Sequence, residues 1–134
     1  MHQKDPVRGF LMKRGCPDHV VQGGLTGLVE AWEDVVLSVA QGYGLGLDDY
    51  LNDVDGRQLL EEAIALASAD EKKAVLQRVR RADRAMKALV RPSKRCLWDS
   101  ETVQERHWTA EKNWWYFSIP REAGPDLLSE IEHI

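Results

Sequence analysis

Apolar residues recur at helical spacing over the stretch that follows Asp18. Wound at 3.6 residues per turn, they share a sector about 100° wide: Val21, Leu25, Leu28, Trp32, Val35, Val36 and Val39. Pro17 and Asp18 form a start signal, and the glycines Gly42, Gly44 and Gly46 end the pattern. The pattern predicts an amphipathic helix that begins at Asp18 and ends before these glycines.

A second apolar pattern follows another helix start signal. Ser68 and Glu71 have the S-x-x-E spacing of a capping box, in which each side chain bonds the other residue's backbone N–H. Apolar residues then recur at steps of four, three, four and three: Val75, Val79, Ala82, Met86 and Leu89. Because proline disfavours the helical conformation in the residue before it, Pro92 ends the helix, which we expect to run to Val90.

The stretch between these two helices changes its helical phase. Leu47, Leu51 and Val54 keep one phase, and another is kept by Leu59, Leu60, Ala63, Ile64 and Ala67. The change falls at Asp55-Gly56. The pattern therefore predicts a short helix near 48–54 and a longer one near 57–68.

Regular periodicity is weaker at both ends of the chain. Residues 1–15 are polar with Pro6, Gly9 and Gly15 among them, and they predict a loose N-terminal arm before a single helical domain over 16–134. The aromatic stretch 114–119 predicts a short strand, and Gly124-Pro125 begins a last short helix. The predicted fold class is mainly α: a single-domain bundle of four to five helices with an irregular, aromatic-rich C-terminal segment.

The amino-acid composition excludes some classes of protein but does not indicate an activity. The 134 residues are 43% hydrophobic, which is enough for a folded core and excludes wholesale disorder. Eighteen Lys and Arg against 22 Asp and Glu give a net charge of −4, so the chain as a whole is not built to coat nucleic acid or an anionic membrane. Its apolar runs fall far short of the ~20 residues that cross a bilayer, and the first fifteen residues lack the apolar core that we expect of a secretory signal. We expect a cytoplasmic protein with no membrane contact, whose Cys16 and Cys96 are reduced thiols.

Charge is distributed unevenly along the chain. Residues 71–95 contain ten Lys or Arg against Glu71 and Asp83, whereas 48–70 contain seven acids and only Arg57. Five of these cations form one line opposite the apolar face, here called the basic stripe: Lys73, Arg80, Arg84, Lys87 and Arg91. Such a stripe suits a row of phosphates, which makes nucleic-acid binding an alternative function, or it is simply a solvated helix face.

Aromatic residues gather near the C-terminus, as Trp98, Trp108, Trp114, Trp115, Tyr116 and Phe117. Aromatic side chains beside basic residues are typical of binding hot spots, and the other interpretation is that they pack the end of the bundle. On a strand, alternate residues face opposite ways. We therefore predict that 115, 117 and 119 are buried, and that Trp114 and Tyr116, with His107 and Trp108 beside them, line a partly exposed partner-binding groove.

Three further constellations bear on chemistry. Cys16, His19, Cys96 and His107 are suitable donors for zinc, but one pair has ten residues between its members, longer than the usual clip. Asp53, Asp55 and Gly56 resemble part of a calcium loop, but Leu51 stands at the first ligand position and offers no oxygen. The sequence carries no signature of a known hydrolase, phosphate loop or dinucleotide fold. We expect no metal and no cofactor.

The leading functional hypothesis is a small, non-catalytic cytoplasmic protein that acts by macromolecular interaction. Its partner is expected to be another protein or a second copy of this chain, bound by His107, Trp108, Trp114 and Tyr116. The alternative is nucleic-acid binding through the basic stripe, and the third hypothesis is an enzyme with an unrecognised Cys/His site.

Overall fold

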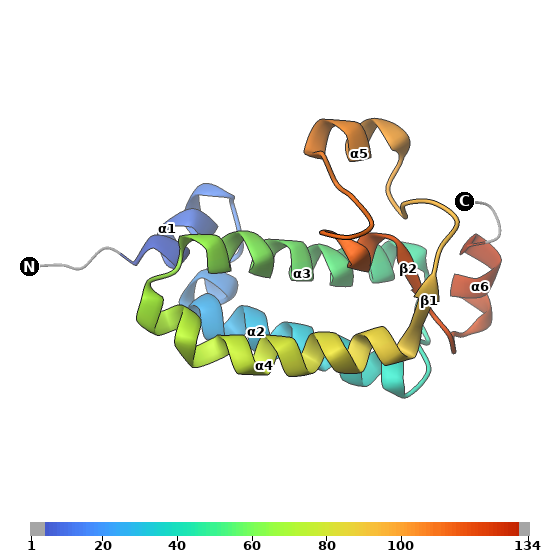
Figure 1. Ribbon diagram of the computed structural model, residues 1–134, viewed down its shortest axis with the longest axis horizontal. Coiled ribbons are helices and arrows are strands. Elements are labelled where there is room, and N and C mark those ends of the chain that lie inside the picture. The colour runs from blue at the N-terminus through green and yellow to red at the C-terminus, as the bar shows by residue number, and fades with distance from the viewer. Residues whose placement is uncertain (1–4, 132–134) are drawn as a thin grey trace, which may run out of the picture.

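The computed structural model describes residues 5–131, and over this range the protein is a mainly helical single domain, which confirms the predicted fold class. Three long helices lie side by side: α2 (Asp18–Ala40), α3 (Leu47–Leu66) and α4 (Ala69–Leu89) (Figure 1). Two short helices pack at opposite ends of this bundle, α1 (Pro6–Lys13) on α2 and α3, and α6 (Pro125–Ile131) on α3. Within residues 5–131 no helix has the length and apolar character that spanning a bilayer would require.

The predicted boundaries of α2 and the predicted start of α4 are confirmed, whereas α4 ends at Leu89, one residue earlier than predicted, because Val90 begins β1. At the start of α4 the Ser68 hydroxyl accepts from the Glu71 backbone N–H, and the Glu71 carboxylate accepts from the Ser68 backbone N–H. Inside α2 the backbone leaves the helical conformation at Gly24 (φ 59°), a region that favours glycine. The Arg8 guanidinium fills this kink and donates to the backbone carbonyls of Val21 and Gln22. A side chain of α1 thereby satisfies carbonyl groups at the break.

The prediction of a loose arm is wrong for residues 6–13, which form α1. Asp5 caps the helix by accepting from the Arg8 backbone N–H, and Pro6 occupies a first-turn position, where its missing N–H costs nothing. Val7 and Leu11, four residues apart, are fully buried. Two buried residues are too few to make a visible periodicity, which is why the sequence pattern does not reveal this helix. Residues 1–4 and 132–134, at the outer ends of the predicted arm and domain, lie outside the described residues.

The predicted helix break at Asp55-Gly56 is also wrong, because α3 runs through it. The buried face of α3 is one continuous line: Tyr50, Val54, Arg57, Leu60 and Ala63. Arg57 belongs to that line because its guanidinium bonds the Asp83 carboxylate on α4, at 2.8 and 3.0 Å. When the sequence pattern is read with Arg57 as a surface residue, the line of buried residues is interrupted at this position. The interruption looks like a change of helical phase.

Residues 97–120, here called the aromatic segment, cover one side of the bundle with short elements (Figure 1). They contain α5 (Ser100–Arg106), a single 3-10 turn η1 (Trp114–Tyr116) and β2 (Ser118–Pro120). Strand β2 pairs antiparallel with β1 (Val90–Pro92), and Pro92 opposite Ser118 ends the ladder. The predicted strand is therefore correct only for its C-terminal part. Residues 114–116 instead form a turn in which the Trp114 carbonyl accepts from the Phe117 N–H.

Candidate functional site

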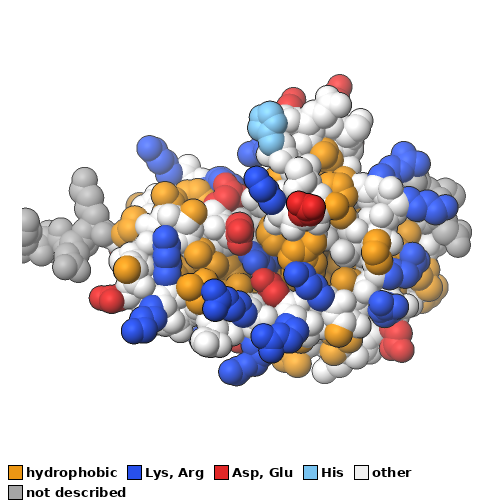
Figure 2. Space-filling model, in the orientation of Figure 1, with side chains coloured by type: hydrophobic (Ala, Val, Ile, Leu, Met, Phe, Trp, Pro, Cys, Tyr) orange, Lys and Arg blue, Asp and Glu red, His pale blue; other side chains and the backbone are white. Residues whose placement is uncertain are grey.

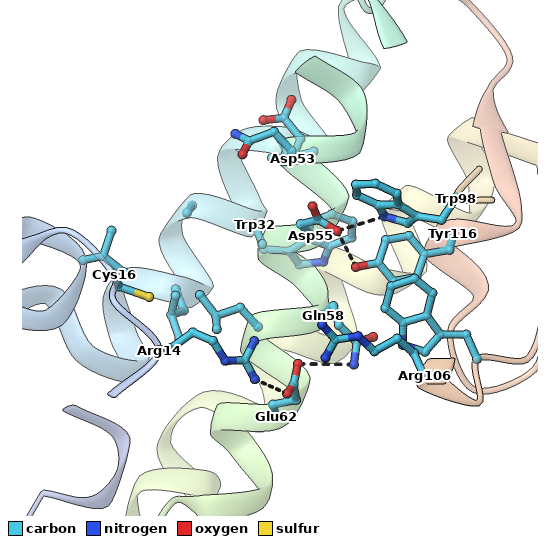
Figure 3. Close-up of a pocket in the computed structure, with 18 of the residues that line it drawn as sticks. Arg14, Cys16, Trp32, Asp53, Asp55, Gln58, Glu62, Trp98, Arg106 and Tyr116 are labelled. Carbon is cyan, nitrogen blue, oxygen red and sulfur yellow. Dashed lines mark hydrogen bonds and ion pairs between the residues drawn. The ribbon is translucent and has the colours of Figure 1, made fainter. Parts of the chain in front are cut away.

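A groove of about 700 Å³ opens between α2, α3 and the aromatic segment (Figure 3). Leu28 and Trp32 on α2 and Leu59 on α3 give it an apolar floor. These side chains lie where the apolar faces of the two helices meet, and Leu28 and Trp32 are themselves buried. We call this the α2–α3 groove.

An aromatic wall closes one side of the α2–α3 groove. The Trp108 ring stacks on Tyr116, with ring centroids 4.1 Å apart and planes inclined by 25°. The Tyr116 hydroxyl donates to the Asp55 carboxylate at 2.5 Å, and the Trp98 indole N–H donates to the same oxygen at 3.2 Å. Asp55 thus attaches the aromatic segment to α3 through two aromatic side chains (Figure 3).

Burial and the Asp55 carboxylate together keep the Tyr116 hydroxyl of this wall protonated. Burial is the larger cause, and the hydrogen bond to Asp55 adds to it, so the pKa of the Tyr116 phenol lies far above its ordinary value. Tyr116 therefore stays protonated and remains a hydrogen-bond donor at physiological pH. The wall is preformed, because the Tyr116 hydroxyl and the Trp98 indole already have a partner inside the protein.

The two ends of the α2–α3 groove differ in charge. At one end lie Asp53 and Asp55, and within residues 5–131 no Lys or Arg lines that end. Burial raises the pKa of Asp53, an effect opposed by the hydrogen bond that its carboxylate accepts from the Tyr43 hydroxyl at 2.6 Å. At the other end Arg14 pairs with Glu62, and Arg106 lies nearby (Figure 3).

The structure separates the four predicted partner-binding residues. Trp108 and Tyr116 both line the α2–α3 groove, but Tyr116 is only 1% exposed. The prediction that Phe117 is buried and Tyr116 partly exposed is wrong: Phe117 is half-buried, because the 3-10 turn abolishes the strand alternation. His107 is exposed and ends α5 in a left-handed conformation (φ 58°). Trp114 lies elsewhere, in a second groove.

That second groove, here called the Trp114 groove, joins the aromatic segment to the basic stripe. It measures about 300 Å³, and Trp114, Phe117, Lys87 and Arg91 are among its lining residues. The Lys87 ammonium lies 5.1 Å from the centre of the Trp114 ring, within the range of a cation–π contact. All five residues of the basic stripe are exposed.

The candidate residues for metal binding do not form a metal site in the described part of the chain. Over residues 5–131 no three His, Cys, Asp or Glu side chains lie close enough to hold a metal ion. Asp53 and Asp55 lie inside α3 and not in a loop of the kind that calcium requires. Burial raises the pKa of the Cys96 thiol, which is the opposite of what an activated nucleophile needs.

The sequence pattern does not reveal Asp55 and the apolar floor as parts of the site. Asp55 falls at the predicted break in a helix, and only the tertiary contacts with Trp98 and Tyr116 give it another role.

Comparison with known proteins finds no relative of this chain: no family model, no curated protein and no solved structure matches it. The role of the α2–α3 groove is therefore inferred from its geometry.

Proposed function

We propose that this protein is a non-catalytic binding protein that holds a short segment of a partner protein in the α2–α3 groove. The observation that carries the proposal is the combination of a volume of about 700 Å³ with an apolar floor and an aromatic wall. Binding sites of this size are mostly apolar with a few placed polar groups, and binding hot spots are enriched in tryptophan and tyrosine. The proposal keeps the cytoplasmic location that the sequence predicts.

The lining of the α2–α3 groove indicates the chemistry of the bound segment. The floor of Leu28, Trp32 and Leu59 suits an aliphatic or aromatic anchor side chain. The Asp53 and Asp55 end suits a Lys or Arg close to that anchor, because opposite charges across an interface favour binding and select the partner. We therefore infer a segment in which a large apolar residue lies next to a basic one.

The polar groups around the groove favour binding over chemistry. Asp55, Trp98 and Tyr116 are bonded to one another, and Arg14 is paired with Glu62. Side chains that are already bonded to one another hold the walls of the groove in place. Because the site is preformed, less conformational freedom is lost when a ligand binds. This arrangement supports a docking surface more than a set of reacting groups.

The proposal is tested by selecting peptides from a random display library against the purified protein. We expect enriched peptides to share a large apolar residue beside Lys or Arg and to bind with a micromolar Kd. Ala31 is exposed on α2 and lines the groove, so Ala31→Arg should fill it and weaken the selected peptides by about tenfold or more. Ala40→Arg, also on an exposed position of α2, is the matched control and should bind normally.

Two results would contradict the proposal. One is that no peptide family is enriched from the library. The other is that selected peptides bind Ala31→Arg as tightly as Ala40→Arg, which would locate the peptide site outside the α2–α3 groove.

A further inference from the structure

The basic stripe and the aromatic segment, which are far apart in the sequence, meet at the Trp114 groove. Four of the five stripe residues lie on α4, and the fifth, Arg91, lies on β1 directly after it. Lys87 and Arg91 line the groove together with the Trp114 and Phe117 rings. A line of cations therefore ends at two half-buried aromatic side chains.

The positive charge of this face is not cancelled by the acids of the same stretch. Glu71 bonds Ser68 in the capping box, and Asp83 bonds Arg57 from α3 and the Trp32 indole. Arg78, at the edge of α4 towards α2, is the cation that pairs with Glu33. Figure 2 shows Lys and Arg side chains gathered along the side of the molecule that carries α4.

The dimensions of the stripe fit an extended chain of phosphates better than a single anion. From Lys73 to Lys87 the helix rises by about 21 Å at 1.5 Å per residue. One phosphate occupies one or two cations, whereas a strand that follows the stripe reaches all of them. At the end of the stripe, edge contacts with Trp32 and Trp115, at centroid distances of 6.4 and 5.6 Å, hold the Trp114 ring in place.

We propose that this face binds single-stranded nucleic acid, with the phosphates along the basic stripe and a base in the Trp114 groove. A groove of about 300 Å³ admits one base, and aromatic rings beside a line of cations are the usual means of binding single strands without sequence preference. The duplex is excluded as the preferred ligand, because its stacked bases are not free to enter the groove. This site is separate from the α2–α3 groove, so either proposal can fail alone.

Fluorescence anisotropy with a labelled uridine RNA of about twelve nucleotides tests the stripe. We expect binding at about 50 mM salt, and log K should fall with log salt at a slope of about −3.5, which is 0.7 for each of five phosphates. Arg84→Glu should weaken binding by about fivefold or more. Lys13→Glu makes the same change in net charge at an exposed position of α1 and should bind like wild type.

Tryptophan fluorescence tests the base site in the same titration. A base against Trp114 should quench part of the protein fluorescence, and Trp114→Phe should lose that quenching while it keeps an aromatic ring in the groove. Trp108→Phe, in the α2–α3 groove, is the matched control and should keep the quenching.

Several results would overturn the proposal. They are an absence of binding at ~100 µM protein in low salt, equal affinity of Arg84→Glu and Lys13→Glu, or quenching that survives in Trp114→Phe. A uridine mononucleotide that binds as tightly as the RNA strand would also overturn it, because the stripe would then contribute nothing.

Discussion

The helical bundle and the aromatic segment are held together in different ways. Helices α2 and α4 bury regular apolar faces, and the buried ion pair of Arg57 with Asp83 joins α3 to α4. The aromatic segment has only short elements, and it is attached to α3 through Trp98 and Tyr116 on Asp55 and through the Asn113 amide on Gln58.

Both grooves lie where these two regions meet. The α2–α3 groove is lined on one side by the bundle and on the other by Trp98 and Trp108 of the aromatic segment. The Trp114 groove likewise lies between the end of α4 and the aromatic segment. Both proposed binding sites are therefore at the boundary between the two regions, and variants that affect one region but not the other distinguish their roles.

The largest expected effect comes from the bundle. Arg57→Ala leaves the Asp83 carboxylate without its cation and removes the guanidinium that lies 4.4 Å from the Trp115 ring centre. Loss of one partner of a buried ion pair costs about 3–5 kcal/mol. Urea unfolding should therefore show that the free energy of unfolding falls by about this amount. Arg78→Ala, which breaks the more exposed pair with Glu33, is the control and should leave the melting temperature nearly unchanged. A small loss for Arg57→Ala would show that this pair contributes little to the stability of the bundle.

A medium effect should be confined to the aromatic segment. Asp55→Ala removes the acceptor for the Tyr116 hydroxyl and the Trp98 indole, at a cost of about 1–3 kcal/mol. Asp55→Asn keeps one side-chain oxygen and should cost less. Hydrogen exchange should accelerate in residues 97–120 while amides of α2 and α4 keep their relative protection. Equal acceleration in all three regions would show that the segment and the bundle open as one unit.

The smallest effect is a pH dependence at the acidic end of the α2–α3 groove. Because burial raises the pKa of Asp53 above its ordinary 3.8, the folded state binds this proton more tightly than the unfolded chain does. The charged carboxylate therefore costs stability above the folded pKa, and this cost disappears as the pH falls towards 3.8. Asp53→Asn keeps an acceptor for Tyr43 and should be more stable than wild type at pH 7 by less than ~1 kcal/mol. Urea unfolding should show this advantage vanish in acid; an advantage that is constant with pH would contradict the cause.

The sequence predicts the helices of the bundle correctly where residues at a helix end mark that end. The capping box at Ser68 and the glycines after α2 are local signals, and the apolar faces between them repeat over many turns. The predictions fail where a distant residue decides the outcome. Arg57 is inside only because the Asp83 carboxylate, 26 residues further along the chain, bonds its guanidinium.

The candidate site is predictable in its residue types but not in its arrangement. The aromatic composition points to Trp108 and Tyr116, which do line the α2–α3 groove. Strand alternation groups Trp114 with them, whereas its contact with Lys87 joins it to the basic stripe. Asp55 carries no sequence signal for its role, because its two donors are more than forty residues away along the chain.

The indole N–H signals of the five tryptophans offer the most direct test of the central claim, that the α2–α3 groove binds a protein segment. Trp98 and Trp108 line this groove, whereas Trp114 lines the other one. When a library-selected peptide is added to ¹⁵N-labelled protein, we expect the Trp98 and Trp108 indole signals to shift and the Trp114 signal to stay in place. Shifts confined to Trp114, with Trp98 and Trp108 unchanged, would contradict the claim.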